Sequence, residues 1–509
     1  MACHHPREQP VLVQSRQNPK PPGAIATRAV GANLLDCAAS TRRTRNDNAG
    51  KGGWVDHQDD GRGSIPDRGP PAPDDHLAKQ AVRAASLGMF LDGFDLSIMA
   101  IALLPLRAQW HLGAGAIGNL MAAALIGSLL GGLIGGRLVD RFGRRALLLP
   151  NVALYALGAI ASALSPGLAT LWIGRFVVGL AVGMDYPLVA TVVAEYSAEH
   201  DRGRGFAGIN VAWYLGAFAS TLLGLALLGL GPDSWRLMLG AALLPALVLL
   251  WLRRSIPESP RWLMRRGSQA AARAALQRLH PAWGETHITD ALTRFSGTAR
   301  RTTTLFQRRW RKRLVLSLVP WTCLDIVGLG IGLYFPLILR MQGLANNNTA
   351  AAGINAAFLL VSTAGILFIY RRLDRWGRIP LQTAGFALMV VGLLLFALGI
   401  ATHEVVSVYA GSAVYSLGTG IGPGVTAMAL SVEIFPTELR ASAGGLATAT
   451  SRLGAAFSAI VFPRLETAWG LPVVLILMAG VSLIGAGVTR GYPVEPAGHT
   501  LEALEDHGD

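Results

Sequence analysis

Twelve long apolar segments dominate the sequence from about residue 84 onward. A helix rises about 1.5 Å per residue, so segments of this length can cross a hydrocarbon core about 30 Å thick, the longer ones with a tilt. The sequence therefore predicts an all-α polytopic membrane protein. Its transmembrane helices are expected near 85–106, 115–137, 146–165, 169–195, 205–229, 235–253, 313–339, 350–370, 380–400, 405–431, 441–463 and 469–489.

Composition argues against several other classes of protein. Hydrophobic residues make up 51% of the 509 residues and charged residues 15%, whereas about 25% of a typical soluble domain is charged. A soluble enzyme, a disordered scaffold and a disulfide-rich secreted module are therefore disfavoured. The three cysteines, Cys3, Cys37 and Cys323, lack metal-ligand spacing and cannot form a disulfide framework, so no metal site is expected.

The basic residues predict the orientation of the chain in the membrane. With the N-terminus inside, the inner loops carry 26 Lys and Arg residues, and the outer loops carry Arg107, Arg236, Arg340 and Arg464. The positive-inside rule then places both termini in the cytoplasm and the protein in the cell inner membrane. The net charge of +14 is thereby explained by topology, so the expected partner is the lipid bilayer and not nucleic acid. Residues 1–30 lack the apolar core of a cleavable signal, so the first spanning helix is expected to direct insertion.

The sequence divides into five regions. Residues 1–83 are polar and show no hydrophobic period; they are either a disordered cytoplasmic extension or the product of a start site assigned too far upstream. Residues 84–253 and 313–490 are each expected to form a six-helix bundle. Between them lies a cytoplasmic loop, 254–312, with a helical pattern over Ser268–Leu279, and 491–509 form a cytoplasmic tail. The protein is expected to function as a monomer.

An internal repeat supports the division into two bundles. The sequence Gly-Arg-Leu-Val-Asp-Arg-Phe-Gly-Arg-Arg at 136–145 recurs as Arg-Arg-Leu-Asp-Arg-Trp-Gly-Arg at 371–378. Asp140 and Asp374 are 234 residues apart, and Glu195 and Glu433 are 238 apart. Two motifs with nearly the same offset indicate a duplicated six-helix unit, and hence two pseudo-symmetric bundles.

The repeated loop has the residues of a latch that closes one side of a transporter, although a simple anchoring loop would use similar residues. Glycines permit a tight turn, arginines suit anionic lipid or a helix C-terminus, and a carboxylate can pair with arginine or cap a helix. The gating motif comprises Gly136, Asp140, Arg141, Gly143, Arg144, Arg145, Asp374, Arg375, Gly377, Arg378, Glu195, Arg202, Glu433 and Arg440.

These motifs resemble those of the major facilitator superfamily over about residues 84–490. Arg175-Phe176, Gly179, Gly183, Pro257–Leu263 (PESPRWL) and Glu433–Arg440 (EIFPTELR) are similar to the sugar-porter and metabolite–proton symporter branches. The resemblance implies two six-helix bundles around a central cavity, with alternating access. It also implies that an acidic residue of helix 1, here Asp95 or second Asp92, pairs with Arg175 of helix 4 for proton coupling.

Charges inside the helices are the candidate proton-coupling groups. Asp92 and Asp95 are three residues apart and lie on roughly one helix face. Charged groups are costly in hydrocarbon, so these carboxylates, Arg175 and Asp185 should face a cavity or a partner. A carboxylate that alternately meets an arginine and a closed pocket could bind and release protons. A permanent buried ion pair is the alternative.

The substrate class is less constrained. Asp185-Tyr186, Trp321 and Asp325 resemble the phosphate–proton symporters, but Leu329, Gly424 and Tyr214 or Leu215 replace polar phosphate contacts of that family. Helix 7 lacks the glutamine-rich pattern of sugar porters, and helix 5 lacks the proline of drug–proton antiporters. The segment Asp-Gly-Phe-Asp at 92–95 resembles organic-acid symporters. With Arg175 and Arg452 as possible cavity cations, an organic anion is the leading substrate, although Arg452 could instead hold the end of helix 11.

The sequence thus predicts a proton-coupled secondary transporter that imports a small, anionic metabolite, with no cofactor other than the proton. Asp185, Tyr186, Trp321, Asp325 and Arg452 are the predicted substrate contacts. A proton-coupled exporter, a phosphate symporter and a sugar symporter are the alternatives, and sodium could replace the proton. A membrane sensor is a more distant alternative, and an enzyme is not expected, because the helices carry no nucleophile–base or metal cluster.

Overall fold

In the computed structural model, the structure describes residues 76–196, 202–296, 305–370, 372–435 and 437–495. These residues contain helices and turns and no strand. They belong to the compact unit formed by residues 68–509; the other unit, residues 1–67, lies outside the described residues. Within the described part, eleven helices are long and apolar enough to cross a membrane. The all-α polytopic fold is as predicted.

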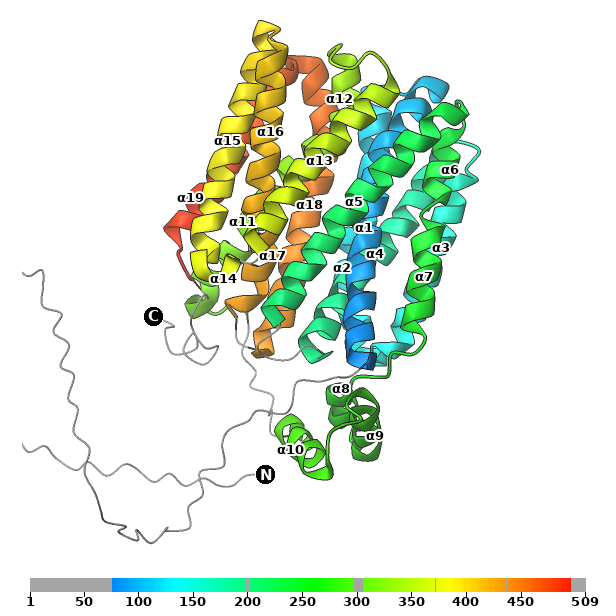
Figure 1. Ribbon diagram of the computed structural model, residues 1–509, viewed down its shortest axis with the longest axis vertical. Coiled ribbons are helices and arrows are strands. Elements are labelled where there is room, and N and C mark those ends of the chain that lie inside the picture. The colour runs from blue at the N-terminus through cyan, green and yellow to red at the C-terminus, as the bar shows by residue number, and fades with distance from the viewer. Residues whose placement is uncertain (1–75, 197–201, 297–304, 371, 436, 496–509) are drawn as a thin grey trace, which may run out of the picture. The chain divides into compact units, whose positions relative to one another are not determined.

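The first half contains six spans, shown from blue to green in Figure 1. The sixth span consists of two short helices separated by a turn. The helices are α1 (His76–Trp110), α2 (Ala114–Phe142), α3 (Arg145–Ala163), α4 (Leu168–Tyr196), α5 (Arg202–Leu227), α6 (Ser234–Gly240) and α7 (Leu243–Arg253).

The second half repeats this arrangement from Arg311 onward. The tenth span of the chain is interrupted at Gly422 and Pro423, because proline has no N–H to donate within a helix. The interruption leaves two shorter helices. For this reason length and composition identify eleven spanning helices, whereas the sequence predicts twelve. The helices are α11 (Arg311–Gly332), α12 (Phe335–Met341), α13 (Asn348–Tyr370), α14 (Leu373–Trp376), α15 (Arg378–Thr402), α16 (Val405–Ile421), α17 (Pro423–Glu433), α18 (Thr437–Trp469) and α19 (Leu471–Gly491).

The first helix begins earlier than the sequence analysis expected. Residues 76–83, assigned there to the polar extension, form the first two turns of α1. Ala81 is fully buried, and Nε2 of Gln80 donates hydrogen bonds to the Leu252 carbonyl at 3.0 Å and to Oγ of Ser255 at 2.7 Å. Packing against the end of α7 therefore stabilises a helix beyond the apolar run that predicts it.

The central connection is more structured than the sequence indicates. The predicted helix is present as α9 (Gln269–Leu279), and it packs with α8 (Pro260–Arg265) and α10 (Glu285–Ser296). A small apolar core composed of Ala272, Leu276, Ile288 and Leu292 holds these helices together. The helix α8 begins where the pattern favours a start, because the Ser259 side chain accepts a hydrogen bond from the Trp262 N–H and Pro260 occupies the first turn.

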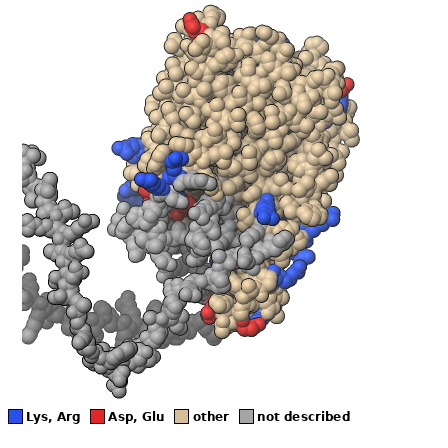
Figure 2. All heavy atoms as spheres, viewed as in Figure 1, with Lys and Arg blue, Asp and Glu red and all other residues tan. Residues whose placement is uncertain are grey.

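The surface agrees with a bilayer environment. Figure 2 shows a broad face of the bundle with almost no charged side chain, and Lys and Arg gathered at one end of it. Large apolar side chains such as Leu164, Val406 and Phe457 are more than half exposed. Such a belt is expected where helices face lipid.

Close helix packing inside the belt uses small residues. At Gly179 of α4 a Cβ would lie 1.9 Å from the Ala124 carbonyl oxygen of α2, so only glycine fits there.

Candidate functional site: a central cavity and buried ion pairs

Each half contains a glutamate that caps the helix after the repeated loop. In the first half, Gly143 has a φ of +91°, and the carboxylate of Glu258 accepts hydrogen bonds from the backbone N–H groups of Arg144 at 2.8 Å and Arg145 at 3.1 Å. A carboxylate is favoured at a helix N-terminus, where N–H groups are free to donate. A Cβ at Gly143 would lie 2.4 Å from Oε2 of Glu258, so the glycine makes room for this cap.

The same arrangement recurs in the second half, as the repeat predicts. Gly377 has a φ of +81°, and Glu495 accepts hydrogen bonds from the N–H groups of Arg378 at 2.9 Å and Ile379 at 2.8 Å. The Arg378 side chain also pairs with Glu433, Nε to Oε2, at 3.1 Å. The sequence analysis missed Glu495, although Pro493-Val494-Glu495 resembles Pro257-Glu258.

The other members of the gating motif are only partly described. The carbonyl of Arg141 accepts a hydrogen bond from Arg266 of the central connection. A Cβ at Gly136 would meet no atom within 4 Å, and Arg375 is exposed. The side chains of Asp140, Glu195, Arg202, Asp374 and Arg440 lie outside the described residues, so the latch stays a prediction.

The predicted coupling pair is in contact deep in the first half. Arg175 of α4 donates to both oxygens of Asp95 of α1, Nη1 to Oδ1 at 2.8 Å and Nη2 to Oδ2 at 2.5 Å. The Tyr155 hydroxyl of α3 donates to Oδ1 at 3.4 Å. Both charged side chains are 2% exposed. A buried carboxylate and a buried guanidinium are stable only when each is paired and hydrogen-bonded, and this two-point contact meets that need.

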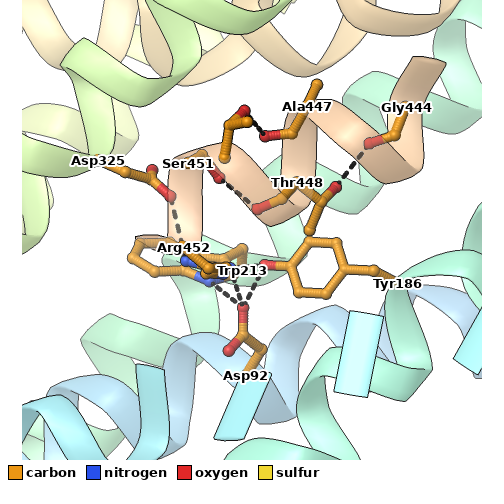
Figure 3. A network of polar contacts seen from close by, with 10 residues as sticks. Asp92, Tyr186, Trp213, Asp325, Gly444, Ala447, Thr448, Ser451 and Arg452 are labelled. Atoms are coloured by element: carbon orange, nitrogen blue, oxygen red, sulfur yellow. Dashed lines mark hydrogen bonds and ion pairs between the residues drawn. The ribbon is translucent and has the colours of Figure 1, made fainter. Parts of the chain in front are cut away.

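A second charged cluster joins the two halves. Arg452 of α18 lies between Asp325 of α11 and Asp92 of α1, with 3.3 Å from Nη1 to Oδ2 of Asp325 and 3.3 Å from Nη2 to Oδ2 of Asp92. Arg452 also donates to the hydroxyl of Tyr186 in α4. That hydroxyl donates to Asp92 at 2.6 Å, and the indole N–H of Trp213 in α5 donates to the same oxygen at 2.9 Å. Figure 3 shows these side chains converging on the guanidinium.

Close packing of α1 on α5 positions this cluster. A Cβ at Gly93 would lie 2.0 Å from the Trp213 carbonyl oxygen. Because glycine lets the two backbones approach, the Trp213 ring can reach the carboxylate of the adjacent Asp92.

A cavity of about 190 Å³ lies between the halves. The predicted contacts Tyr186, Trp321, Asp325 and Arg452 line it, as do Leu329, Gly424 and Tyr214 at the positions where the phosphate pattern is lost. The interruption at Pro423 also lines it, in agreement with the rule that irregular backbone in a membrane faces a cavity. The further polar and aromatic lining residues are Ser97, Asn210, Trp213, Phe335, Asn355, Phe358, Ser362, Tyr415, Ser416 and Thr419.

Asp185, predicted as a substrate contact and as a proton-coupling group, does not line this cavity. Its oxygens each lie 2.7 Å from an Nη atom of Arg253 at the end of α7, and Nδ2 of Asn151 donates to Oδ1 at 3.0 Å. A Cβ at Gly88 would lie 2.3 Å from Oδ2 of Asp185. The physical reason is helix geometry: neighbours on a helix point about 100° apart, so Tyr186 can face the cavity while Asp185 faces α7.

Three residues of these clusters were not identified from the sequence. Arg253 ends the expected helix 235–253 and was given no role there, yet its side chain is 1% exposed. Asn151 and Tyr155 both accompany buried carboxylates. They are four residues apart in an apolar helix, so both lie on one face. This spacing is the sequence pattern from which the two residues could have been identified.

Comparisons with known proteins agree with this arrangement. A family model described as "Sugar (and other) transporter" matches residues 81–507. YaaU of Escherichia coli strain K12, which carries the name of a metabolite transport protein, is 31% identical over 418 residues, covering 81% of this chain and 91% of YaaU. The inner membrane metabolite transport protein YgcS of the same strain is 30% identical over 445 residues, covering 83% of this chain and 95% of YgcS.

Solved structures match the fold. The structure described as a partially occluded inward open conformation of the xylose transporter XylE from E. coli has a TM-score of 0.72 with 23% sequence identity. The match covers 83% of this chain and 99% of that one. The resemblance drawn from the sequence motifs is thus confirmed.

Removing the hydroxyl of Tyr186 tests the cluster. In Tyr186→Phe, buried Arg452 loses an acceptor and buried Asp92 loses a donor. We expect a destabilisation of about 2–3 kcal/mol, because hydrogen bonds to buried charged groups contribute more than neutral ones. The measurement is the thermal unfolding midpoint of the detergent-purified protein.

The matched control is Tyr409→Phe, whose hydroxyl donates to one backbone carbonyl, that of Leu344, at 2.9 Å. Its expected cost is smaller, about 1 kcal/mol. Equal midpoints for the two variants would contradict the arrangement around Arg452.

Proposed function

Because the chain belongs to the family of sugar and other transporters, we propose that it imports a small hydroxylated organic anion together with protons, by alternating access. The family makes it a multi-pass membrane transporter of a small molecule and not an enzyme. The charge of the substrate, the coupling ion and the direction of transport belong to the proposal.

Arg452 carries the proposal for an anion. It lines the cavity, it is 4% exposed, and its Nε has no hydrogen-bond partner among the described residues. Guanidinium groups bind carboxylates through paired, charge-assisted hydrogen bonds. A substrate carboxylate could use Nε and one Nη of Arg452, in place of Asp92 or Asp325.

The rest of the cavity favours a hydroxylated molecule of modest size. Trp213 and Trp321 contribute aromatic rings to the lining, and Asn210, Asn355 and Thr419 contribute polar side chains. The volume of about 190 Å³ is below the range of about 300–1,000 Å³ that is usual for drug-sized ligands. A sugar acid combines a carboxylate for Arg452 with hydroxyls for the amides and an apolar ring face for the tryptophans.

Charge balance supports coupling to protons. The cluster contains two carboxylates, Asp92 and Asp325, and one guanidinium, so an incoming carboxylate adds a further negative charge to a buried site. Unbalanced charge is costly inside a membrane protein. Uptake of protons with the anion neutralises the added negative charge, and such joint uptake of anion and proton is symport. Asp95, held by Arg175 away from the cavity, would take the coupling proton when the pair separates during alternating access.

The basic end of the bundle supports the orientation. Lys and Arg gather at one end of the face in Figure 2, as the positive-inside rule requires of the cytoplasmic side. We propose that both termini are cytoplasmic, that the protein lies in the inner membrane, as the name of its relative YgcS states for that protein, and that it functions as a monomer.

The matched probes D-glucuronate and D-glucose test the substrate class, because they differ by a carboxylate in place of a hydroxymethyl group. In proteoliposomes with an inwardly directed proton gradient, radiolabelled D-glucuronate should accumulate and D-glucose should not. Arg452→Gln should lower that uptake about tenfold or more, since the loss of hydrogen bonds to a charged group costs about 1.5–3 kcal/mol.

Arg340→Gln is the control, because Arg340 contacts Asn348 and the Ala345 carbonyl outside the cavity lining. Accumulation of D-glucose alone, unaffected by Arg452→Gln, would identify a neutral-sugar symporter and overturn the anion proposal. Accumulation of inorganic phosphate alone would identify the phosphate alternative.

Asp95→Asn tests the coupling pair. Because an amide cannot take up and release the proton, we expect gradient-driven accumulation of D-glucuronate to be lost while counterflow exchange persists. Asp233→Asn is the control, since Asp233 is an exposed acid beside Arg236. Unchanged gradient-driven accumulation in Asp95→Asn would refute the role of Asp95.

A further inference from the structure

A second, smaller cavity lies inside the first half, among α1, α3, α4 and α7. Its volume is about 20 Å³, and Met89 and Tyr186 line both this inner chamber and the cavity between the halves. Asp92, Asn151, Tyr155 and Asp185 line the inner chamber and do not line the central cavity. The chamber therefore brings together residues from all three buried carboxylate clusters of this half.

Two buried acceptors in this lining have no hydrogen-bond partner among the described residues: Oδ1 of Asp92 and Oδ1 of Asn151. The two side chains are 3% and 4% exposed. The donors around them are directed elsewhere, since Tyr186 and Trp213 donate to the other oxygen of Asp92 and the Asn151 amide donates to Asp185. Buried acceptors without a donor are costly and are usually satisfied by ordered water.

The chamber suits one water molecule. A buried water needs about 10–15 Å³ of space and two or more polar partners, and about 20 Å³ is present. A water molecule carries two donors, which equals the number of unsatisfied acceptors. Its oxygen can in turn accept from a protonated carboxyl group.

We propose that the inner chamber binds an ordered water that donates to Oδ1 of Asp92 and to Oδ1 of Asn151, and that this water carries protons between Asp92 and Asp185. In the transfer, a protonated Asp92 donates to the water oxygen, so the O–H that pointed to Oδ1 of Asp92 turns to the Asp185 carboxylate. The water accepts the proton of the Asp92 carboxyl group and gives this O–H proton to Asp185. The products are an Asp92 carboxylate, a water molecule and a protonated Asp185, so atoms and charge balance.

This route would separate the path of the proton from that of the substrate. Asp92 meets the central cluster through Arg452, whereas Asp185 is held by Arg253, the last residue of α7. A proton leaving Asp92 through the chamber reaches Asp185, which is paired with the last residue of α7, without crossing the central cavity. The use of the route for symport rests on the proposed function, while the water site itself does not.

X-ray radiolytic footprinting tests the water site without any substrate, because radicals formed from a bound water modify the side chains beside it. Tyr155 lines the chamber, and Tyr334, equally buried at 2% exposure, stacks on Phe462 and lines neither cavity. We expect Tyr155 to be modified several-fold faster than Tyr334 in the wild-type protein. Equal rates in the wild type would overturn the proposal, whatever the transport assays show.

Variants at Asn151 test the proton route. Asn151→Leu removes the acceptor and fills the chamber, and it should reduce modification of Tyr155 to the level of Tyr334. It should also lower gradient-driven D-glucuronate uptake by about tenfold or more with counterflow exchange unchanged. Asn151→Ser keeps a polar acceptor and space for water, so it should retain labelling and most gradient-driven uptake.

A normal response of Asn151→Leu to the proton gradient, with Tyr155 labelling lost, would overturn the proton route. An equal loss of gradient-driven uptake and counterflow would do the same. If the wild-type protein labels at Tyr155 but transports no D-glucuronate in either assay, the water site stands and the proposed function fails.

Discussion

The guanidinium of Arg452 joins the two halves of the molecule beside the cavity. It is contributed by α18 of the second half, and it contacts Asp92 and Tyr186 of the first half as well as Asp325 of its own. Removing one partner from such a buried charged cluster typically costs about 3–5 kcal/mol, so the halves cannot separate around the cavity unless something replaces those contacts. A substrate carboxylate is the replacement that the chemistry of arginine favours. Under the proposed function, the occupancy of the cavity would then depend on the relative position of the halves, as alternating access requires.

Two further buried ion pairs of the first half lie away from the cavity. Asp95 with Arg175 and Asp185 with Arg253 each form a two-point contact, and each has a hydrogen-bond donor from α3 beside it. The groups that we propose to carry protons are thus concentrated in one half, while the aromatic and amide residues of the cavity lining come from both. This division allows proton binding and substrate binding to influence each other through Asp92, which belongs to both the Arg452 cluster and the inner chamber.

Much of the fold could be predicted because hydrophobic length and loop charge are local properties of the sequence. The interruption of the tenth span was not predicted. Gly422-Pro423 is a local break signal, but the apolar run around it is long enough to span the membrane, and membrane helices tolerate proline. The contact between Asp95 and Arg175 was expected from the family resemblance. The partners of Asp185 and of the capped helix at Gly377 were not, because Arg253 and Glu495 are distant in sequence. Arg253 ends an expected helix, and Glu495 lies in the segment assigned to the tail. Periodicity identifies the face of a helix, but the packing of several helices decides which side chain that face meets.

The central claim is that an anion enters the Arg452 cluster together with a proton. The most direct test is the number of protons taken up when D-glucuronate binds, obtained by titration calorimetry of the purified protein in buffers with different ionisation enthalpies. Binding that perturbs the protonation of a cluster must exchange protons with the solution. The account predicts uptake of about one proton per bound anion in the wild-type protein. Binding of D-glucuronate with no proton uptake at any pH would contradict it.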